Sequence, residues 1–111
     1  MTESGTGKNF QELLQTAQHV QQELSKIQAE LAQKTVEGRA GGGMVVAVAN
    51  GRQQLVSLRI EPEVVDPGEI GMLQDLVVAA ANQALSRSAE LAQQEMAKVT
   101  GQMNLKLTGL L

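Results

Sequence analysis

The sequence contains no cysteine, no tryptophan and no tyrosine, and its 111 residues include one phenylalanine. The lack of cysteine excludes disulfides and thiolate chemistry, which fits a protein of the reducing cytoplasm. With one aromatic ring, the core must consist of smaller aliphatic side chains, and bases of a single-stranded nucleic acid have no platform on which to stack. The longest apolar runs, Met44–Ala49 and Leu76–Ala81, are too short to cross a bilayer, so we expect no membrane partner.

Residues for catalysis or metal binding are also scarce. His19 is the single histidine and has no second ligand at metal-binding spacing, so we expect it at a solvated helix position. No Ser-His-Asp set or catalytic pair of carboxylates is recognisable. The carboxylates Glu12, Glu23 and Glu30 follow helical spacing among Gln and Ser, which is typical of a solvated helix face. We therefore expect no enzyme, no cofactor and no small-molecule substrate.

The chain is acidic, with nine Lys or Arg against twelve Asp or Glu and a net charge of −3. A polyanion could therefore bind only at a local basic patch. The length allows one domain, whose core is modest unless the protein oligomerises. We expect a polar, flexible N-terminal tail over residues 1–8, a single domain over residues 9–104 and a C-terminal tail over residues 105–111.

The first part of the domain has the pattern of a long helix from Asn9 to about Lys34. Asn9 is suited to cap its start, with Glu12 three residues later. Apolar residues then recur at alternating steps of three and four, at Phe10, Leu13, Ala17, Val20, Leu24, Ile27 and Leu31. Such a helix is roughly 39 Å long, which is more than a small core needs. We favour a dimer in which part of this seam pairs with another helix; the alternative is a monomer whose second helix covers it.

The middle of the chain has the pattern of an antiparallel sheet, with strands expected over Thr35–Ala40, Met44–Ala49 and Gln53–Ile60. Gly41–Gly43 makes the first turn, because glycine accepts backbone angles closed to other residues, and Asn50-Gly51 is a strong hairpin signal. Alternation along the third strand places Leu55 on the face of Arg59, opposite Leu58. The second strand is apolar on both faces. The helices of the same chain can cover one of these faces, and a second subunit can cover the other. This again favours a dimer.

A second helix is expected from Pro67 to Thr100. The start signal is a typical one. Asp66 is the cap, Pro67 follows at the first helical position, and Glu69 lies three residues after the cap. The segment Val77–Ala84 is rich in small residues, which would let another backbone come close, and Gly101 can end the helix. The sequence thus predicts an α+β fold: a long helix, a three-stranded antiparallel meander and a second long helix.

Several of these residues together resemble the YbaB/EbfC family of nucleoid-associated DNA-binding proteins. The matching motifs are Val36-x-Gly38-x-Ala40-Gly41-Gly42-Gly43-x-Val45, Asn50-Gly51, Ile60-x-Pro62 and Leu73-x-Asp75-Leu76-Val77-x-Ala79-Ala80-x-Asn82-x-Ala84. Together with the Gln- and Glu-rich first helix they extend over about Phe10 to Leu105. The resemblance implies a cytoplasmic, nucleoid-associated homodimer with projecting helical arms. Such a protein coats or bridges double-stranded DNA and sometimes alters gene expression.

Nine basic residues could contact phosphates: Lys8, Lys26, Lys34, Arg39, Arg52, Arg59, Arg87, Lys98 and Lys106. In an antiparallel meander Arg39 and Arg59 lie towards the same end of the sheet, with Arg52 about 20 Å away at the other end. The candidate nucleic-acid-binding residues are Lys26, Lys34, Arg39, Arg52 and Arg59. We expect Lys34, Arg39 and Arg59 to provide the main contacts, with Lys26 on the helical arm. The alternative for each is an ordinary solvated charge beside a glutamate.

Two further alternatives stay open. Gly41–Gly43 is either a tight hairpin turn, which we favour, or a nest of backbone amides that binds an anion. The protein is either a DNA-binding homodimer, which the resemblance favours, or a dimeric protein-interaction module with little affinity for DNA, which the acidic balance favours. Binding through phosphates weakens steeply as salt rises, whereas apolar contacts do not, so salt dependence separates the two functions.

Overall fold

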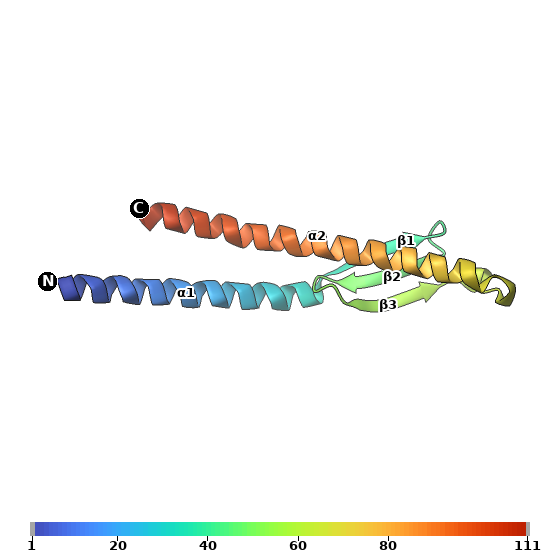
Figure 1. Cartoon of the computed structure of the whole chain (residues 1–111), viewed down its shortest axis with the longest axis horizontal. Coiled ribbons are helices and arrows are strands. Elements are labelled where there is room, and N and C mark those ends of the chain that lie inside the picture. The colour runs from blue at the N-terminus through green and yellow to red at the C-terminus, as the bar shows by residue number, and fades with distance from the viewer. Residues whose placement is uncertain (1, 111) are drawn as a thin grey trace.

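The protein consists of a three-stranded sheet and two long helices (Figure 1). A computed structural model describes the backbone of residues 2–110 and the side chains of residues 9–101. The elements in chain order are α1 (Thr2–Gln33), β1 (Thr35–Ala40), β2 (Val45–Asn50), β3 (Leu55–Ile60), the 3₁₀ turns η1 (Pro62–Val64) and η2 (Pro67–Glu69), and α2 (Ile70–Leu110). This order confirms the predicted α+β fold.

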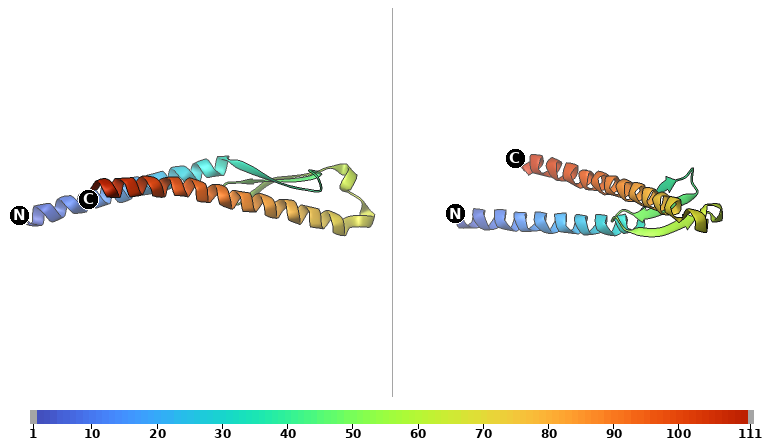
Figure 2. Two further views of the ribbon diagram at one scale, coloured as in Figure 1. Left: turned by 90° about the horizontal axis from the view of Figure 1, so that it is seen from above. Right: turned by 45° about the vertical axis from the view of Figure 1, so that its right-hand side comes forward.

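The molecule is elongated, measuring 82 by 19 by 18 Å. Its radius of gyration is 22.2 Å, whereas a compact chain of this length would have about 13 Å. The sheet lies at one end, and the helices run from it in the same direction, so that both termini lie at the other end (Figures 1 and 2). The projecting helices are therefore confirmed, and the dimer stays a prediction.

Both helices are longer than their sequence patterns predicted. α1 begins at Thr2, so Asn9 lies inside the helix and does not cap it, and α2 continues past Gly101 to Leu110. Neither extension contains proline, and each of the two glycines in either extension costs only about 1 kcal/mol relative to alanine, so neither helix is forced to stop. The expected tails, residues 1–8 and 105–111, lie outside the residues whose side chains are described, and that division of the chain stays a prediction.

The start of α2 follows the predicted signal. The Asp66 carboxylate accepts a hydrogen bond of 2.9 Å from the N–H of Gly68. Pro67 is the first residue of the η2 turn, where its missing N–H is not needed. The turn leads directly into α2 at Ile70. The cap is therefore confirmed, although the first turn is 3₁₀ rather than α-helical.

The sheet has the order β1-β2-β3, with both neighbouring pairs antiparallel. β1 has the predicted bounds. β2 begins one residue later than predicted because Met44 belongs to the glycine turn, where its N–H bonds to the carbonyl oxygen of Gly41. β3 begins at Leu55 and not at Gln53, because Gln53 has a positive φ of 62° and belongs to the hairpin turn.

A β-bulge changes which face of the sheet one β3 side chain occupies. The register shifts between Val48 and Ala49, so that Leu55 pairs with Ala49. Ala49 belongs to the buried cluster beneath α2. Leu55 therefore lies on the α2 side of the sheet with Leu58, and the alternation that placed it on the face of Arg59 was wrong at this residue.

The core lies where α2 packs on β1 and β2. Its buried side chains are Val45, Ala47, Ala49, Val64, Ala80 and Ala84. Gly38 in β1 makes this close approach possible, because a Cβ atom there would overlap the backbone of Ala80 and Ala84. A second cluster, in which Ile27 and Leu31 of α1 pack against Val99 of α2, joins the two helices near the sheet.

α2 covers only part of the apolar seam of α1. Leu24, Ile27 and Leu31, in the half nearer the sheet, lie within the cluster that joins the helices. Phe10 and Leu13, in the other half, are 61% and 67% exposed. A second helix of the same chain therefore accounts for one half of the seam and not for the other.

Candidate nucleic-acid interface

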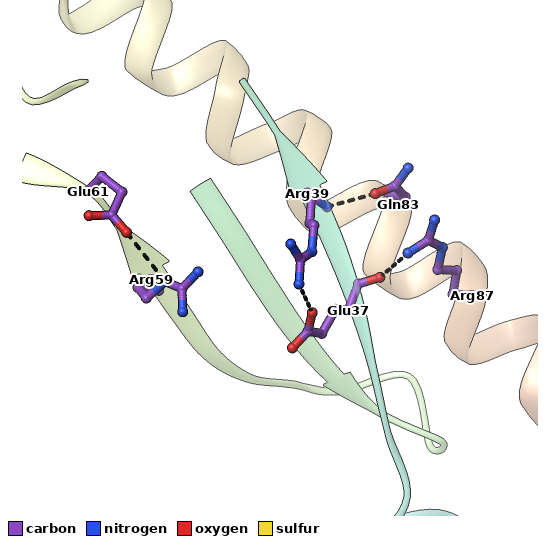
Figure 3. A network of polar contacts seen from close by, with 6 residues as sticks. All are labelled: Glu37, Arg39, Arg59, Glu61, Gln83 and Arg87. Carbon is purple, nitrogen blue, oxygen red and sulfur yellow. Dashed lines mark hydrogen bonds and ion pairs between the residues drawn. The ribbon is translucent and has the colours of Figure 1, made fainter. Parts of the chain in front are cut away.

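Arg39 and Arg59 lie on the face of the sheet that α2 does not cover. The register pairs both with Val46 of β2, so the three residues form one row across the sheet. Figure 3 shows Arg39 on β1 and Arg59 on β3. Val46 is 3% exposed, whereas the two arginine side chains are 59% and 67% exposed. The sheet thus brings together two of the predicted site residues, and we call them the arginine row.

Each arginine of this row has a glutamate beside it. Arg39 Nη2 lies 2.9 Å from Glu37 Oε2, and Arg59 Nε lies 3.8 Å from Glu61 Oε1 (Figure 3). Ion pairs between exposed side chains contribute about 0–1 kcal/mol, because water screens them and the side chains lose freedom. A phosphate group could therefore take the place of either glutamate at little cost. The arrangement is compatible with phosphate binding and equally with ordinary solvated charge.

Two residues of α2 that were not among the predicted site residues hold the outer edge of β1. The backbone N–H of Arg39 donates to Gln83 Oε1 at 2.6 Å, and Arg87 Nη1 donates to the carbonyl oxygen of Glu37 at 2.7 Å (Figure 3). Their spacing of four residues places them on one side of a helix. The spacing of Gln83 and Arg87 can be seen in the sequence. The sequence does not show, however, which side of α2 borders β1. The contacts fix the strand that carries Arg39 and bring a third arginine close to it.

Lys34 is occupied by a different interaction. Its Nζ lies 2.8 Å from Glu95 Oε1, and Lys98 Nζ lies 3.3 Å from the same oxygen. The Glu95 side chain is 12% exposed. Hydrogen bonds from Lys34 and then Lys98 hold the pKa of the Glu95 carboxyl below its usual range, and the bond to Glu95 raises the pKa of Lys34. Lys34 thus ties the end of α1 to α2, away from the arginine row.

Replacing Glu95 by glutamine is expected to lower the free energy of unfolding at neutral pH. The same replacement should lower it much less in acid. A carboxyl whose pKa is lowered by folding stabilises the folded state above its ordinary pKa, and that stability is lost as pH falls through the lowered value. The difference between wild type and Glu95→Gln should therefore shrink between pH 7 and pH 3. Urea unfolding at both pH values measures it. Glu90→Gln, at an exposed position of the same helix, is the control and should behave as wild type.

Arg52 and Lys26 lie apart from the arginine row. Arg52 lies in the β2–β3 turn. Buried polar side chains stabilise this turn, and Asn50 Oδ1 accepts a hydrogen bond from the N–H of Arg52 at 2.9 Å. Ser88 Oγ donates to the carbonyl oxygen of Asn50 at 2.6 Å and accepts the N–H of Gln53 at 2.9 Å. Lys26 is exposed on α1. Of the five predicted site residues, the structure brings together only Arg39 and Arg59, and the roles of all five stay predictions.

Two backbone N–H groups of the glycine turn bond within the turn. Gly41, Gly42 and Gly43 have φ values of 63°, 68° and 92°, which other residues rarely adopt. The N–H groups of Gly43 and Met44 bond to the carbonyl oxygens of Ala40 and Gly41, each at 3.3 Å. These bonds close a hairpin turn, which is the alternative that we favoured over an anion-binding nest.

Neither a metal cluster nor a membrane-spanning helix is found among the described residues. Among them, no three His, Asp or Glu side chains gather as they would around a metal ion. In the same part of the chain, no helix is both long and apolar enough to cross a membrane.

Comparisons with known proteins agree on one family. The model of the YbaB/EbfC DNA-binding family matches residues 6–103. A nucleoid-associated protein of Caldanaerobacter subterraneus is 54% identical over 99 residues, covering 89% of each chain. One of Syntrophobacter fumaroxidans is 50% identical over 100 residues, covering 87% of this chain and 91% of that one. The crystal structure of an uncharacterised protein of Helicobacter pylori has a similar fold, with a TM-score of 0.66, 22% identity, and coverage of 91% of this chain and 96% of that one.

Proposed function

The chain belongs to the YbaB/EbfC DNA-binding family, and from this membership we propose that it is a nucleoid-associated homodimer that binds double-stranded DNA mainly through phosphate contacts. The family is a DNA-binding one, which confirms the expectation that the chain is not an enzyme. The relatives named nucleoid-associated proteins support the same location for this chain, on the DNA of the cytoplasm.

The observation that carries the binding mode is the arginine row. Arg39 and Arg59 are exposed on the sheet face opposite the one on which α2 packs. Two guanidinium groups on the two outer strands, either side of β2, can contact phosphates without reading bases. The single aromatic residue of the chain leaves no set of rings for stacking. We therefore expect binding that prefers duplex DNA, tolerates many sequences and is strengthened by a second arginine row from the other subunit.

A second candidate function is a protein-interaction module. The observation that favours it is the uncovered half of the α1 seam, where Phe10 and Leu13 are mostly exposed together with Leu14 at 47%. Exposed apolar residues at this spacing suit an amphipathic partner helix. On this alternative, the arms bind another protein and the arginines are ordinary surface charges.

A mobility-shift titration of the purified protein on one duplex, at 50 and 200 mM salt, tests the proposal. If four arginines of a dimer displace counterions, the affinity should fall by about 100-fold between the two salt concentrations. A shift that does not change with salt would argue against phosphate-driven binding. No shift at either salt concentration, from a protein whose sedimentation shows a folded dimer, would favour the protein-interaction module.

A further inference from the structure

Gly51 lies in the β2–β3 turn at a point where α1 comes too close for a side chain. Unlike the glycines of the first turn, Gly51 does not have a positive φ, so a left-handed backbone is not the reason for glycine here. A Cβ atom at Gly51 would lie 2.7 Å from Cδ2 and 2.8 Å from the carbonyl oxygen of Leu31. Leu31 is 2% exposed in the last turn of α1. Glycine therefore lets the β2–β3 turn touch the end of α1.

The backbone nitrogen of Gly51 uses this contact to hold α1. Its N–H donates to the carbonyl oxygen of Leu31 at 2.8 Å and to that of Lys34 at 3.0 Å. The last carbonyl groups of a helix have no partner within the helix, so a donor from elsewhere in the chain stabilises them. This one nitrogen atom therefore links the end of α1 to the β2–β3 turn.

The side chain of the preceding residue, Asn50, is equally well held. It is 6% exposed. Its Oδ1 accepts the N–H of Arg52 at 2.9 Å and the N–H of Gln54 at 3.3 Å, and its Nδ2 donates to Gln54 Oε1 at 2.9 Å. Rotating this carboxamide would break all three hydrogen bonds and leave buried polar groups without partners, which is unfavourable.

An asparagine followed by glycine is chemically unstable when the backbone is free to move, because no side chain hinders attack by the glycine nitrogen. Once a base has removed its proton, the Gly51 nitrogen would attack Cγ of Asn50. The bond from Cγ to Nδ2 breaks, ammonia leaves with a proton from solvent, and a five-membered succinimide remains. Water then opens the ring to aspartate or isoaspartate. Asn50 is the only asparagine of this sequence that glycine follows.

We propose that Asn50-Gly51 is a deamidation site that the anchored end of α1 keeps closed. The attacking nitrogen keeps its proton between two carbonyl oxygens of α1. The carboxamide that it would attack is fixed by three hydrogen bonds, and both residues are buried from the base and water that the reaction needs. Release of α1 from the turn frees the nitrogen and admits water. The proposal concerns this turn alone and is independent of DNA binding.

The reaction makes the release of α1 irreversible. The succinimide has no N–H at Gly51, so neither hydrogen bond to α1 can form while the ring persists. Isoaspartate lengthens the main chain of the turn by one carbon atom, and aspartate places a negative charge at a position that is 6% exposed. Each chain that reacts therefore holds α1 less firmly than before.

Incubation of the full-length protein at mildly alkaline pH, with and without a urea concentration that unfolds it, tests whether the site is closed. Peptide mapping by mass spectrometry measures aspartate and isoaspartate at Asn50 over time. We expect deamidation to be at least about 100-fold slower in the folded chain, because it requires a local opening. Equal rates in the folded and unfolded chains would overturn the proposal.

Two core variants test whether α1 is what closes the site. Ile27 packs in the cluster that joins α1 to α2, and Val64 packs in the core between α2 and the sheet; each is 7% exposed. Under folding conditions Ile27→Ala should accelerate deamidation on the order of 10-fold, because the cavity weakens the attachment of α1. Val64→Ala is the matched control and should stay near wild type.

Urea unfolding of both variants separates release of α1 from unfolding of the whole chain. Acceleration in both variants, in proportion to their lost unfolding free energy, would overturn the role of α1, since global unfolding would then open the site. Acceleration by Ile27→Ala beyond its loss of unfolding free energy would support that role. If Ile27→Ala does not fold, Ile27→Val makes the same comparison with a smaller cavity.

Discussion

Replacing Gly38 by alanine is expected to destabilise the fold by about 3 kcal/mol, because the added methyl group has no space. A Cβ atom at this position would overlap the carbonyl oxygen of Ala80 and the amide nitrogen of Ala84. Both atoms belong to the backbone of α2, so no side chain can rotate to relieve the overlap. The helix would have to lift from β1, and the buried contacts of Val45 and Ala47 would open with it.

Urea unfolding followed by circular dichroism measures this loss, and the same substitution at Gly71 is the matched control. A Cβ atom at Gly71 would meet nothing within 4 Å, and the residue lies in α2. Glycine inside a helix is less favourable than alanine by roughly 0.5–1 kcal/mol, so Gly71→Ala should stabilise the protein. Equal stability of Gly38→Ala and wild type would mean that α2 does not pack directly on β1.

The fold could be predicted from the sequence because its signals are local. The three-four spacing of apolar residues indicated α1, the glycines and Asn50-Gly51 marked the turns, and Asp66 marked the start of α2. The predicted start of α1 at Asn9 and the predicted end of α2 at Thr100 were wrong, because a capping residue or a glycine permits a helix to begin or end and does not require it. The β-bulge at Ala49 was missed because strict alternation was assumed where the register shifts.

The candidate site was predictable only where the sheet register decides it. The antiparallel meander alone places Arg39 and Arg59 in one row, since the turns fix which residues pair. The partner of Lys34 is Glu95, 61 residues away, and the pairing depends on how α1 and α2 meet beyond the sheet. The same holds for the contacts of Gln83 and Arg87 with β1. Local sequence patterns carry no information about such packing angles.

Reversing both charges of the arginine row, Arg39→Glu with Arg59→Glu, is expected to weaken DNA binding by about 100-fold or more at low salt and to flatten its salt dependence. The new carboxylates would lie beside Glu37 and Glu61, so the row would become an acidic face that repels phosphates. Both side chains are exposed, so the fold should be retained. Mobility-shift titrations at two salt concentrations measure the change, and circular dichroism checks the fold.

The double variant Lys26→Glu with Arg52→Glu provides the matched comparison, because it changes the net charge by the same amount at two other exposed residues. If the whole-molecule charge governs binding, both double variants should lose affinity equally. If the arginine row makes the phosphate contacts, the loss should be concentrated in Arg39→Glu with Arg59→Glu. A loss confined to the Lys26 and Arg52 variant would instead move the interface to the helical arm and the β2–β3 turn. The arginines of the sheet would then be solvated charges paired with Glu37 and Glu61, as their short distances also allow.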